Sequence, residues 1–409
     1  MRILMVSDVY FPRINGVSTS IQTFVNELNR LGHEVTLLCP DYRGNRQTVI
    51  DKDHRLVRIP SKKVLFDPED RYMSRRRIYE LLPWLQQQKF DLLHIQTPFV
   101  AHYMGVRLAE RLGLPSVVSY HTFFEEYLDH YLPLIPKRIL RGLARRFSRK
   151  QCNQVERVIV PSSAMRDVLL AYGVKTTITI LPTGIPLEKF KSGDGKRFRH
   201  KYGIAGTRPL ILTIGRVACE KNIDFLVDVL VRIRLLVPEI LFVIAGEGPM
   251  LPELQRRIER ENLEEHILLV GYLDRETELQ DCYAAADIFV FASRTETQGL
   301  VLLEAMAKGI PLVSTAVMGT RDVLVEKEGC LIAPDEAGAF AARVVRLLGD
   351  ASLRRQLSRT GREYVKRWHA PLFAEQLLAL YRELTGEAGA QEQSNANAGI
   401  TRYRTEFNG

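Results

Sequence analysis

The amino-acid sequence predicts an α/β protein with two domains, each built around a doubly wound parallel sheet. The chain of 409 residues is long for one hydrophobic core and comfortable for two. Short apolar strands alternate with helix-like segments along it, the pattern of βαβ units. A polar, glycine-rich stretch over residues 191–196 follows the first set of units and indicates a linker.

The composition favours a partner that carries phosphates. With 46% hydrophobic and 26% charged residues the chain is ordinary for a soluble protein, and its net charge is +9. That excess suits a nucleotide, a nucleic acid or an anionic membrane. The five cysteines form no C-x-x-C pair, which disfavours disulfides and zinc and fits a reducing compartment. No run reaches the roughly 20 apolar residues of a membrane span. We therefore expect a cytoplasmic protein whose membrane contact is peripheral, on the inner face.

The first unit begins at the N-terminus. Residues 2–7 read as a buried strand, and a loop containing Asn15 and Gly16 follows. Ser18 can cap the next helix, and residues 34–38 form the next strand. This is half of a mononucleotide-binding fold. The lack of G-x-G-x-x-G after the first strand disfavours a dinucleotide enzyme.

A histidine follows a later strand of the first domain. Residues 114–120 read as a strand, and His121 stands at its carboxyl end, where doubly wound folds bind ligands. The alternative is a histidine with a purely structural role.

The segment 133–150 predicts a basic amphipathic helix without acidic residues. Its apolar residues, among them Ile139, Leu140 and Leu143, recur at helical spacing, the pattern of an interfacial membrane anchor. Each cation near an anionic leaflet contributes about 1 kcal/mol. A solvated core helix and a nucleic-acid patch are the alternatives. The candidate membrane residues are Lys137, Arg138, Arg141, Arg145, Arg146, Arg149 and Lys150.

The second domain begins with a strand at 209–214, followed by a basic turn that opens at Gly215. Arg216 and Lys221 flank this turn beside a helix N-terminus, where two cations can neutralise a diphosphate. A basic surface turn without function is the alternative. The glycines after the strand at 241–245 are expected to serve the turn.

A strand–loop–helix segment over residues 286–309 contains most of the candidate ligand-binding residues. Gly299 lets the backbone approach a ligand, and the amides of Gly299, Leu300 and Val301 would stabilise an anion at the helix N-terminus. Glu296 lies in the loop, where it can reach a ligand. Glu304 lies about one turn inside the helix and suits a diol such as a ribose. The alternative is that both glutamates are solvated surface charges without a function.

Taken as a set, these motifs resemble the retaining nucleotide-sugar glycosyltransferases of family 4. The resemblance covers about residues 1–385 and rests on the E-x7-E spacing of Glu296 and Glu304, the Gly-Arg…Glu-Lys-Asn turn, and His121-Thr-Phe-Phe. The run that contains Glu296 and Glu304, and the His121-Thr-Phe-Phe segment, are like the branch that glycosylates membrane lipids such as diacylglycerol. The resemblance implies the GT-B fold, in which two Rossmann-like domains face each other across a cleft. The implied division is an acceptor domain (1–190), a nucleotide-sugar domain (191–365) and a helix that crosses back (366–385). The composition of residues 386–409 predicts a disordered tail.

The resemblance also implies roles for the candidate residues. Glu296 and His121 would contact the donor sugar, and Glu304 the ribose. Arg216 and Lys221, in the turn that begins at Gly215, would stabilise the leaving nucleotide. The segment containing Gln298, Gly299, Leu300 and Val301 would bind the diphosphate, with the backbone of Gly16 facing it. This chain has Asn-Gly at residues 15–16, where many relatives have Gly-Gly. Because no Asp-x-Asp motif stands in the cleft loops, no metal and no cofactor are expected to be required.

The expected activity is transfer of a hexose from a nucleotide diphosphate sugar, a UDP-sugar first, to a membrane lipid hydroxyl such as that of diacylglycerol, with retention. Phosphatidylinositol, a lipid-linked saccharide or a soluble sugar are alternative acceptors. A non-enzymatic sugar-binding clamp is a more remote alternative. A nucleic-acid partner is not expected, because no recognised binding module is present.

Overall fold

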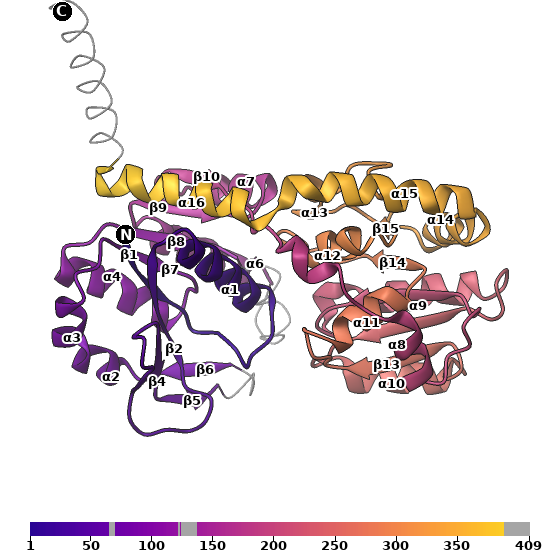
Figure 1. Ribbon diagram of the computed structural model, residues 1–409, viewed down its shortest axis with the longest axis horizontal. Coiled ribbons are helices and arrows are strands. Elements are labelled where there is room, and N and C mark those ends of the chain that lie inside the picture. Colours follow the sequence, from indigo (N-terminus) through magenta and orange to yellow (C-terminus); the bar gives the residue numbers. More distant parts are fainter. Residues whose placement is uncertain (65–69, 122, 124–136, 388–409) are drawn as a thin grey trace, which may run out of the picture.

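The computed structural model describes residues 1–64, 70–121, 123 and 137–387. Residues 388–409 of the predicted disordered tail and residues 133–136 of the predicted basic helix lie outside the described residues. Figure 1 shows two α/β lobes side by side, with the yellow C-terminal helices running along one side of both.

The first lobe contains an eight-stranded sheet with strand order β10-β9-β8-β7-β1-β2-β4-β3. Its strands run parallel except β3, which is antiparallel to β4. The strands are β1 (Arg2–Val6), β2 (Glu34–Pro40), β3 (Val49–Ile50), β4 (Leu56–Ile59), β7 (Leu92–Ile95), β8 (Ser116–Ser119), β9 (Arg157–Val160) and β10 (Ile178–Ile180), with a separate hairpin of β5 (Ser61–Lys63) and β6 (Arg71–Met73). The helices are α1 (Gly16–Arg30), α2 (Arg75–Glu80), α3 (Leu82–Gln87), α4 (Val100–Leu112), α6 (Lys137–Cys152) and α7 (Ser163–Ala171).

The second lobe contains a six-stranded parallel sheet with strand order β13-β12-β11-β14-β15-β16. The strands are β11 (Leu210–Ile214), β12 (Leu241–Ala245), β13 (Ile267–Gly271), β14 (Ile288–Phe291), β15 (Leu312–Ser314) and β16 (Cys330–Ile332). The helices are α8 (Gly195–Lys201), α9 (Ile223–Ile233), α10 (Leu251–Arg260), α11 (Glu278–Ala285), α12 (Leu300–Lys308), α13 (Thr320–Val323), α14 (Ala337–Gly349) and α15 (Ala351–Tyr364), with 3-10 turns η1 (Leu187–Phe190), η2 (Cys219–Lys221) and η3 (Val365–Trp368). The last helix of the chain is α16 (Ala370–Thr385).

The strands are apolar because both faces of each sheet are covered. Every residue of β7 and of β12 is buried, so neither strand alternates between polar and apolar positions. Apolar clusters pack on both faces of the first sheet and on both faces of the second. Because helices cover both faces of each sheet, a ligand is expected to bind to the loops at the carboxyl ends of the central strands.

Helix α16 returns to the first lobe. It packs on α1, and Ala374 and Tyr381 lie in the same apolar cluster as Ile3 of β1. The buried Tyr381 hydroxyl is 2.6 Å from Nδ1 of His94 on β7. Near the predicted domain boundary, Phe190 packs in the core of the second sheet. No helix within the described parts of the chain is long and apolar enough to span a bilayer.

The start of α1 differs from the prediction that Ser18 caps it. The helix begins at Gly16, and Asn15 is its N-cap, with an extended backbone and a side-chain oxygen that accepts from the Ser18 amide at 2.8 Å. Ser18 is instead a buried residue inside the first turn. Asparagine is as good a cap as serine, and here it stands where the chain leaves the extended conformation.

Candidate active site

A cavity of about 370 Å³ lies between the lobes, at the carboxyl ends of both sheets. All of the residues that the sequence predicted for catalysis and substrate binding line it, although they come from distant parts of the chain. They are Gly16, His121, Gly215, Arg216, Lys221, Glu296, Gln298, Gly299, Leu300, Val301 and Glu304.

The N-terminus of α12 opens into this cavity. Gly299 precedes the helix with φ of +96°, and no side chain caps the first turn. This positive φ favours glycine, whereas a Cβ at Gly299 would meet only the end of the flexible Leu302 side chain, with Cδ1 at 2.9 Å. The uncapped amides and the helix dipole make this end suited to an anion.

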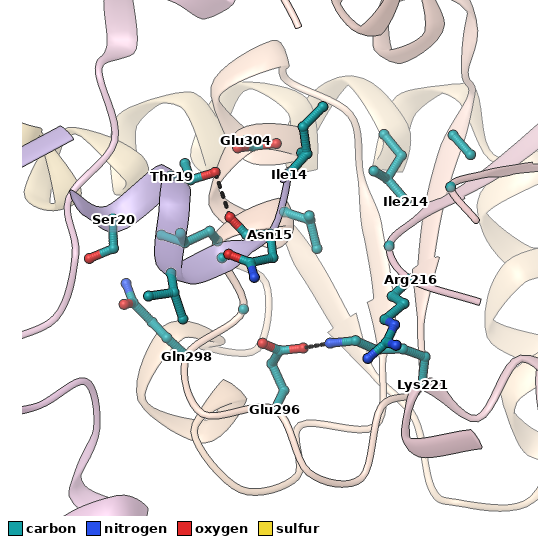
Figure 2. A pocket seen from close by; sticks show the side chains of 18 of the residues that line it. Ile14, Asn15, Thr19, Ser20, Ile214, Arg216, Lys221, Glu296, Gln298 and Glu304 are labelled. Carbon is teal, nitrogen blue, oxygen red and sulfur yellow. Dashed lines mark hydrogen bonds and ion pairs between the residues drawn. The ribbon is translucent and has the colours of Figure 1, made fainter. Parts of the chain in front are cut away.

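A cationic turn faces the same point. The Lys221 ammonium lies 2.5 Å from the Glu296 carboxylate, and Figure 2 shows Arg216 beside this pair. The turn is fixed to the loop after β14, because Ser293 donates to the carbonyl of Glu220 at 2.9 Å and Asn222 donates to that of Ala292 at 3.2 Å. The two cations are therefore set in place before any ligand arrives.

Glu304 is buried in the wall of the cavity and is not a solvated charge. Its carboxylate accepts from Arg275 at 3.0 Å and from the Tyr283 hydroxyl at 2.7 Å. Sequence reasoning missed both partners. No local pattern connects them to Glu304, since they come from a different loop and helix.

His121 enters the cavity from the first lobe, just beyond β8. Its Nε2 is buried and has no hydrogen-bond partner among the described residues. Burial lowers the pKa of His121 to about 4, so the imidazole is neutral at physiological pH. It offers a hydrogen bond, not a positive charge, to whatever occupies the cavity.

Gln298 joins the two lobes. Its side-chain amide accepts from the backbone N–H of Thr183 at 2.9 Å and donates to the Thr183 carbonyl at 2.7 Å. The Thr183 hydroxyl lies 2.6 Å from that of Ser20 on α1. Gln298 thus lines the cavity as predicted, but both ends of its amide are engaged in an interlobe contact that the sequence did not reveal.

The glycines after β12 serve close packing of loops. A Cβ at Gly246 would lie 2.0 Å from the carbonyl oxygen of Gly215, and one at Gly248 would lie 2.3 Å from that of Val217. Gly16 differs, because no described atom lies within 4 Å of where its Cβ would be. The space beside Gly16 opens onto the cavity.

Two family models match the chain, one in each lobe. Residues 14–189 match "Glycosyltransferase Family 4", and residues 194–364 match "Glycosyl transferases group 1". An alpha-monoglucosyldiacylglycerol synthase of Streptococcus pneumoniae is 34% identical over 77% of this chain and 71% of its own length. The enzyme of the same name from Acholeplasma laidlawii is 30% identical over 76% of this chain and 80% of its own.

The chain belongs to glycosyltransferase family 4. A solved structure, Anabaena Alr3699/HepE in complex with UDP-glucose, superposes on this glycosyltransferase with a TM-score of 0.74 at 16% identity, and covers 94% of this chain and 100% of its own. At that identity the likeness concerns the fold, which is GT-B, as the sequence predicted.

The basic helix of this glycosyltransferase, α6, lies in the first lobe. Leu140, Ala144 and Ser148 face inward. Ile139 and Leu143 are 54% and 56% exposed, so the predicted apolar residues are divided between the core and the outer surface of the lobe. One helical position separates Ile139 from Leu140, so packing against the core turns only the latter inward. The exposed cations around the pair are Arg138, Arg141, Arg145, Arg146, Arg149 and Lys150. The side chain of Lys137 lies outside the description.

Across the described ranges of the glycosyltransferase, no three or more His, Cys, Asp or Glu side chains gather in a way that could hold a metal ion. Arg216 and Lys221 line the same cavity as the N-terminus of α12.

Proposed function

We propose that this glycosyltransferase moves a hexose from a nucleotide diphosphate sugar, a UDP-sugar first, to a hydroxyl of a membrane lipid such as diacylglycerol, with retention of configuration. The observation that carries the lipid acceptor is the exposed face of α6, where Ile139 and Leu143 project among cations in the lobe opposite the donor machinery. The names of the relatives from Streptococcus pneumoniae and Acholeplasma laidlawii support the same acceptor class.

The second lobe would bind the donor. The amides at the start of α12 receive the diphosphate, and Arg216 and Lys221 neutralise it from the opposite side. Glu304 accepts hydrogen bonds from the ribose hydroxyls. Glu296, fixed by Lys221, contacts the sugar, and the neutral His121 contacts it from the first lobe.

In the reaction, the bond between the anomeric carbon and the β-phosphate oxygen breaks, and its electrons leave with the nucleotide diphosphate. The lipid hydroxyl oxygen forms the new bond to the same face of that carbon, and its proton passes to the departing phosphate oxygen. The dominant contribution of the protein is stabilisation of the charge on the leaving group by Arg216, Lys221 and the α12 amides. These groups do the work that a metal ion does elsewhere, so we propose that no metal is required.

Helix α6 would dock the enzyme on the inner, anionic face of a membrane. Inserting Ile139 and Leu143 removes apolar surface from water, at about 1.5–3 kcal/mol for each fully buried side chain. Each neighbouring cation adds about 1 kcal/mol on an anionic surface. Such contact is reversible and peripheral.

The test is transfer of label from radiolabelled UDP- and GDP-sugars into a lipid extract, in parallel with a set of soluble sugar acceptors, each with and without EDTA. Label in the organic phase from a UDP-sugar, undiminished by EDTA, is the expected result. Label that appears only in water-soluble product would overturn the lipid acceptor. A rate that EDTA abolishes and Mg²⁺ restores would overturn the metal-free mechanism.

A further inference from the structure

The buried carboxylate of Glu304 is stabilised by the polar groups around it. The residue is 3% exposed, on an otherwise apolar stretch of α12. A buried carboxylate without partners is strongly unfavourable, and a buried pair is favourable only when its geometry is good and its remaining hydrogen-bonding capacity is used. The groups around Glu304 therefore decide where its free lone pairs point.

Each oxygen of the Glu304 carboxylate accepts a hydrogen bond from a different side chain. Arg275 donates to Oε1 at 3.0 Å, and the Tyr283 hydroxyl donates to Oε2 at 2.7 Å. The charge of Glu304 raises the pKa of Arg275, and burial raises that of Tyr283 well above its usual range, so both keep their protons. Both come from one segment, the loop before α11 and α11 itself. One rigid element thus fixes both oxygens.

This arrangement leaves acceptor capacity on each oxygen. A carboxylate oxygen has about two lone-pair sites, and each here has one protein partner. Arg275 and Glu304 line the main cavity and also a smaller polar cavity of about 60 Å³, bounded on its other side by Thr23 and Asn26 of α1. Thr19 and Leu300 line both cavities as well, so the ion pair lies where the two cavities meet. Without Arg275 the carboxylate would be free to turn toward the polar groups of the second.

We propose that Arg275 is a positioning residue for the nucleotide: together with Tyr283, it orients the Glu304 carboxylate so that it accepts from both ribose hydroxyls. The inference rests on the proposed function, in which Glu304 binds the ribose. It assigns to the Arg275–Glu304 pair the discrimination between ribose and deoxyribose nucleotides. Arg275 itself touches the carboxylate and not the reacting atoms.

The test is calorimetric binding of UDP and GDP and of their 2′-deoxy and 3′-deoxy analogues to the wild-type chain and to variants. The variants are Arg275→Gln, Arg275→Lys, Tyr283→Phe, Glu304→Gln and the double variant Arg275→Gln/Glu304→Gln. Arg260→Gln, at an exposed ion pair of the same lobe, is the matched control. The readout is the ratio of ribose to deoxyribose affinity, which a loss of general stability does not change.

We expect the wild-type chain to prefer the ribose nucleotide about tenfold or more, equivalent to about 1.4 kcal/mol. Arg275→Gln should lose most of this preference, as Glu304→Gln does, and the double variant should lose no more than either. Arg275→Lys should retain part of the preference, and Arg260→Gln all of it. If Arg275→Gln does not fold, the test uses Arg275→Lys and Tyr283→Phe. We expect each of these variants to show a reduced preference for the ribose nucleotide.

A wild-type preference in Arg275→Gln, alongside its loss in Glu304→Gln, would overturn the role of Arg275 while leaving the ribose contact intact. Where Arg275→Gln does not fold, an undiminished preference in both Arg275→Lys and Tyr283→Phe would do the same. No preference in the wild-type chain would overturn the ribose contact of the proposed function, and the role of Arg275 with it.

Discussion

The two walls of the cleft differ in the number of charged side chains that line them. Among the described residues that line the cavity, the second lobe contributes several charged side chains, whereas the first contributes Arg13 and otherwise uncharged groups such as His121, Asn15 and Thr19. The charged side chains of the second wall are Arg216, Glu220, Lys221, Arg275, Glu296 and Glu304.

The difference between the walls supports the proposed placement of the two substrates. A diphosphate needs cations and amides already in place, because groups that do not reorganise stabilise developing charge best. An acceptor hydroxyl needs hydrogen-bonding partners, which uncharged groups can supply. The first lobe has a second distinguishing feature, which is helix α6. This helix bears the exposed apolar pair Ile139 and Leu143 on its outer surface. The proposed function therefore places the donor in the second lobe and a lipid acceptor in the first.

The largest effect is expected when the charged wall loses a cation. Lys221→Ala removes the ammonium 2.5 Å from Glu296 and one positive charge facing the leaving group. We expect kcat/KM to fall by about 10²–10³-fold, the usual result of removing one preorganised donor. Steady-state transfer kinetics measure it. Lys366→Ala, at an exposed ion pair, is the control. Near-normal turnover of Lys221→Ala would contradict the assignment of this wall.

The next largest effect is expected at α6. Ile139→Ser/Leu143→Ser should weaken binding to anionic vesicles by about tenfold or more per residue, because each side chain loses about 1.5–3 kcal/mol of burial. Vesicle co-sedimentation measures this loss. Leu235→Ser/Leu236→Ser is the matched control, since these leucines are 77% and 71% exposed in the second lobe. An equal loss in both double variants would show that docking does not distinguish the lobes.

The sequence predicted the cleft better than it predicted the contacts within it. Residues at strand ends, such as His121, Arg216 and Glu296, could be placed because parallel strands bring their carboxyl ends to one edge. The pairs Arg275–Glu304 and Gln298–Thr183 could not be predicted, because they join elements whose mutual orientation depends on tertiary packing. For the same reason, helical periodicity could not tell Leu140, which faces the core, from Ile139, which faces outward.

A third difference between the lobes is acid sensitivity. Burial lowers the pKa of His94 to about 3 and that of His121 to about 4, from 6.5. Between pH 6.5 and 4 each of these two histidines binds more protons in the unfolded chain, so their contribution to the free energy of unfolding falls as pH falls. Burial raises the pKa of Asp8 in the same lobe to about 6, so this carboxyl opposes the histidines below that pH. The expected slope is about 1.4 kcal/mol per pH unit per histidine.

Hydrogen exchange of β7 and β8 at pH 7 and pH 5 measures this slope, with β11 and β12 of the second lobe as the internal reference. We expect protection to be lost in β7 and β8 first, and His121→Asn to reduce the pH dependence. Equal loss in both lobes would contradict the account.

The smallest effect is expected at the contact that joins the walls. Gln298→Ala removes two hydrogen bonds to the Thr183 backbone, each with a net contribution of about 1 kcal/mol. The lobes should open more often, and kcat/KM should fall by at most about 30-fold, the equivalent of about 2 kcal/mol. Transfer kinetics and the radius of gyration from X-ray scattering report the two consequences. An unchanged radius with a much larger loss of rate would instead indicate that Gln298 contacts substrate directly.

The measurement that tests the central claim most directly is the initial rate of label transfer to diacylglycerol in vesicles of increasing anionic lipid content. It compares the wild-type chain with Arg138→Glu/Arg146→Glu on α6, and with Arg355→Glu/Arg359→Glu, the same charge change on the exposed face of α15. We predict that anionic lipid accelerates the wild-type and α15-variant enzymes, and that the α6 variant loses this acceleration while its calorimetric affinity for nucleotide is unchanged. An α6 variant that responds to anionic lipid as the wild-type enzyme does would contradict the account.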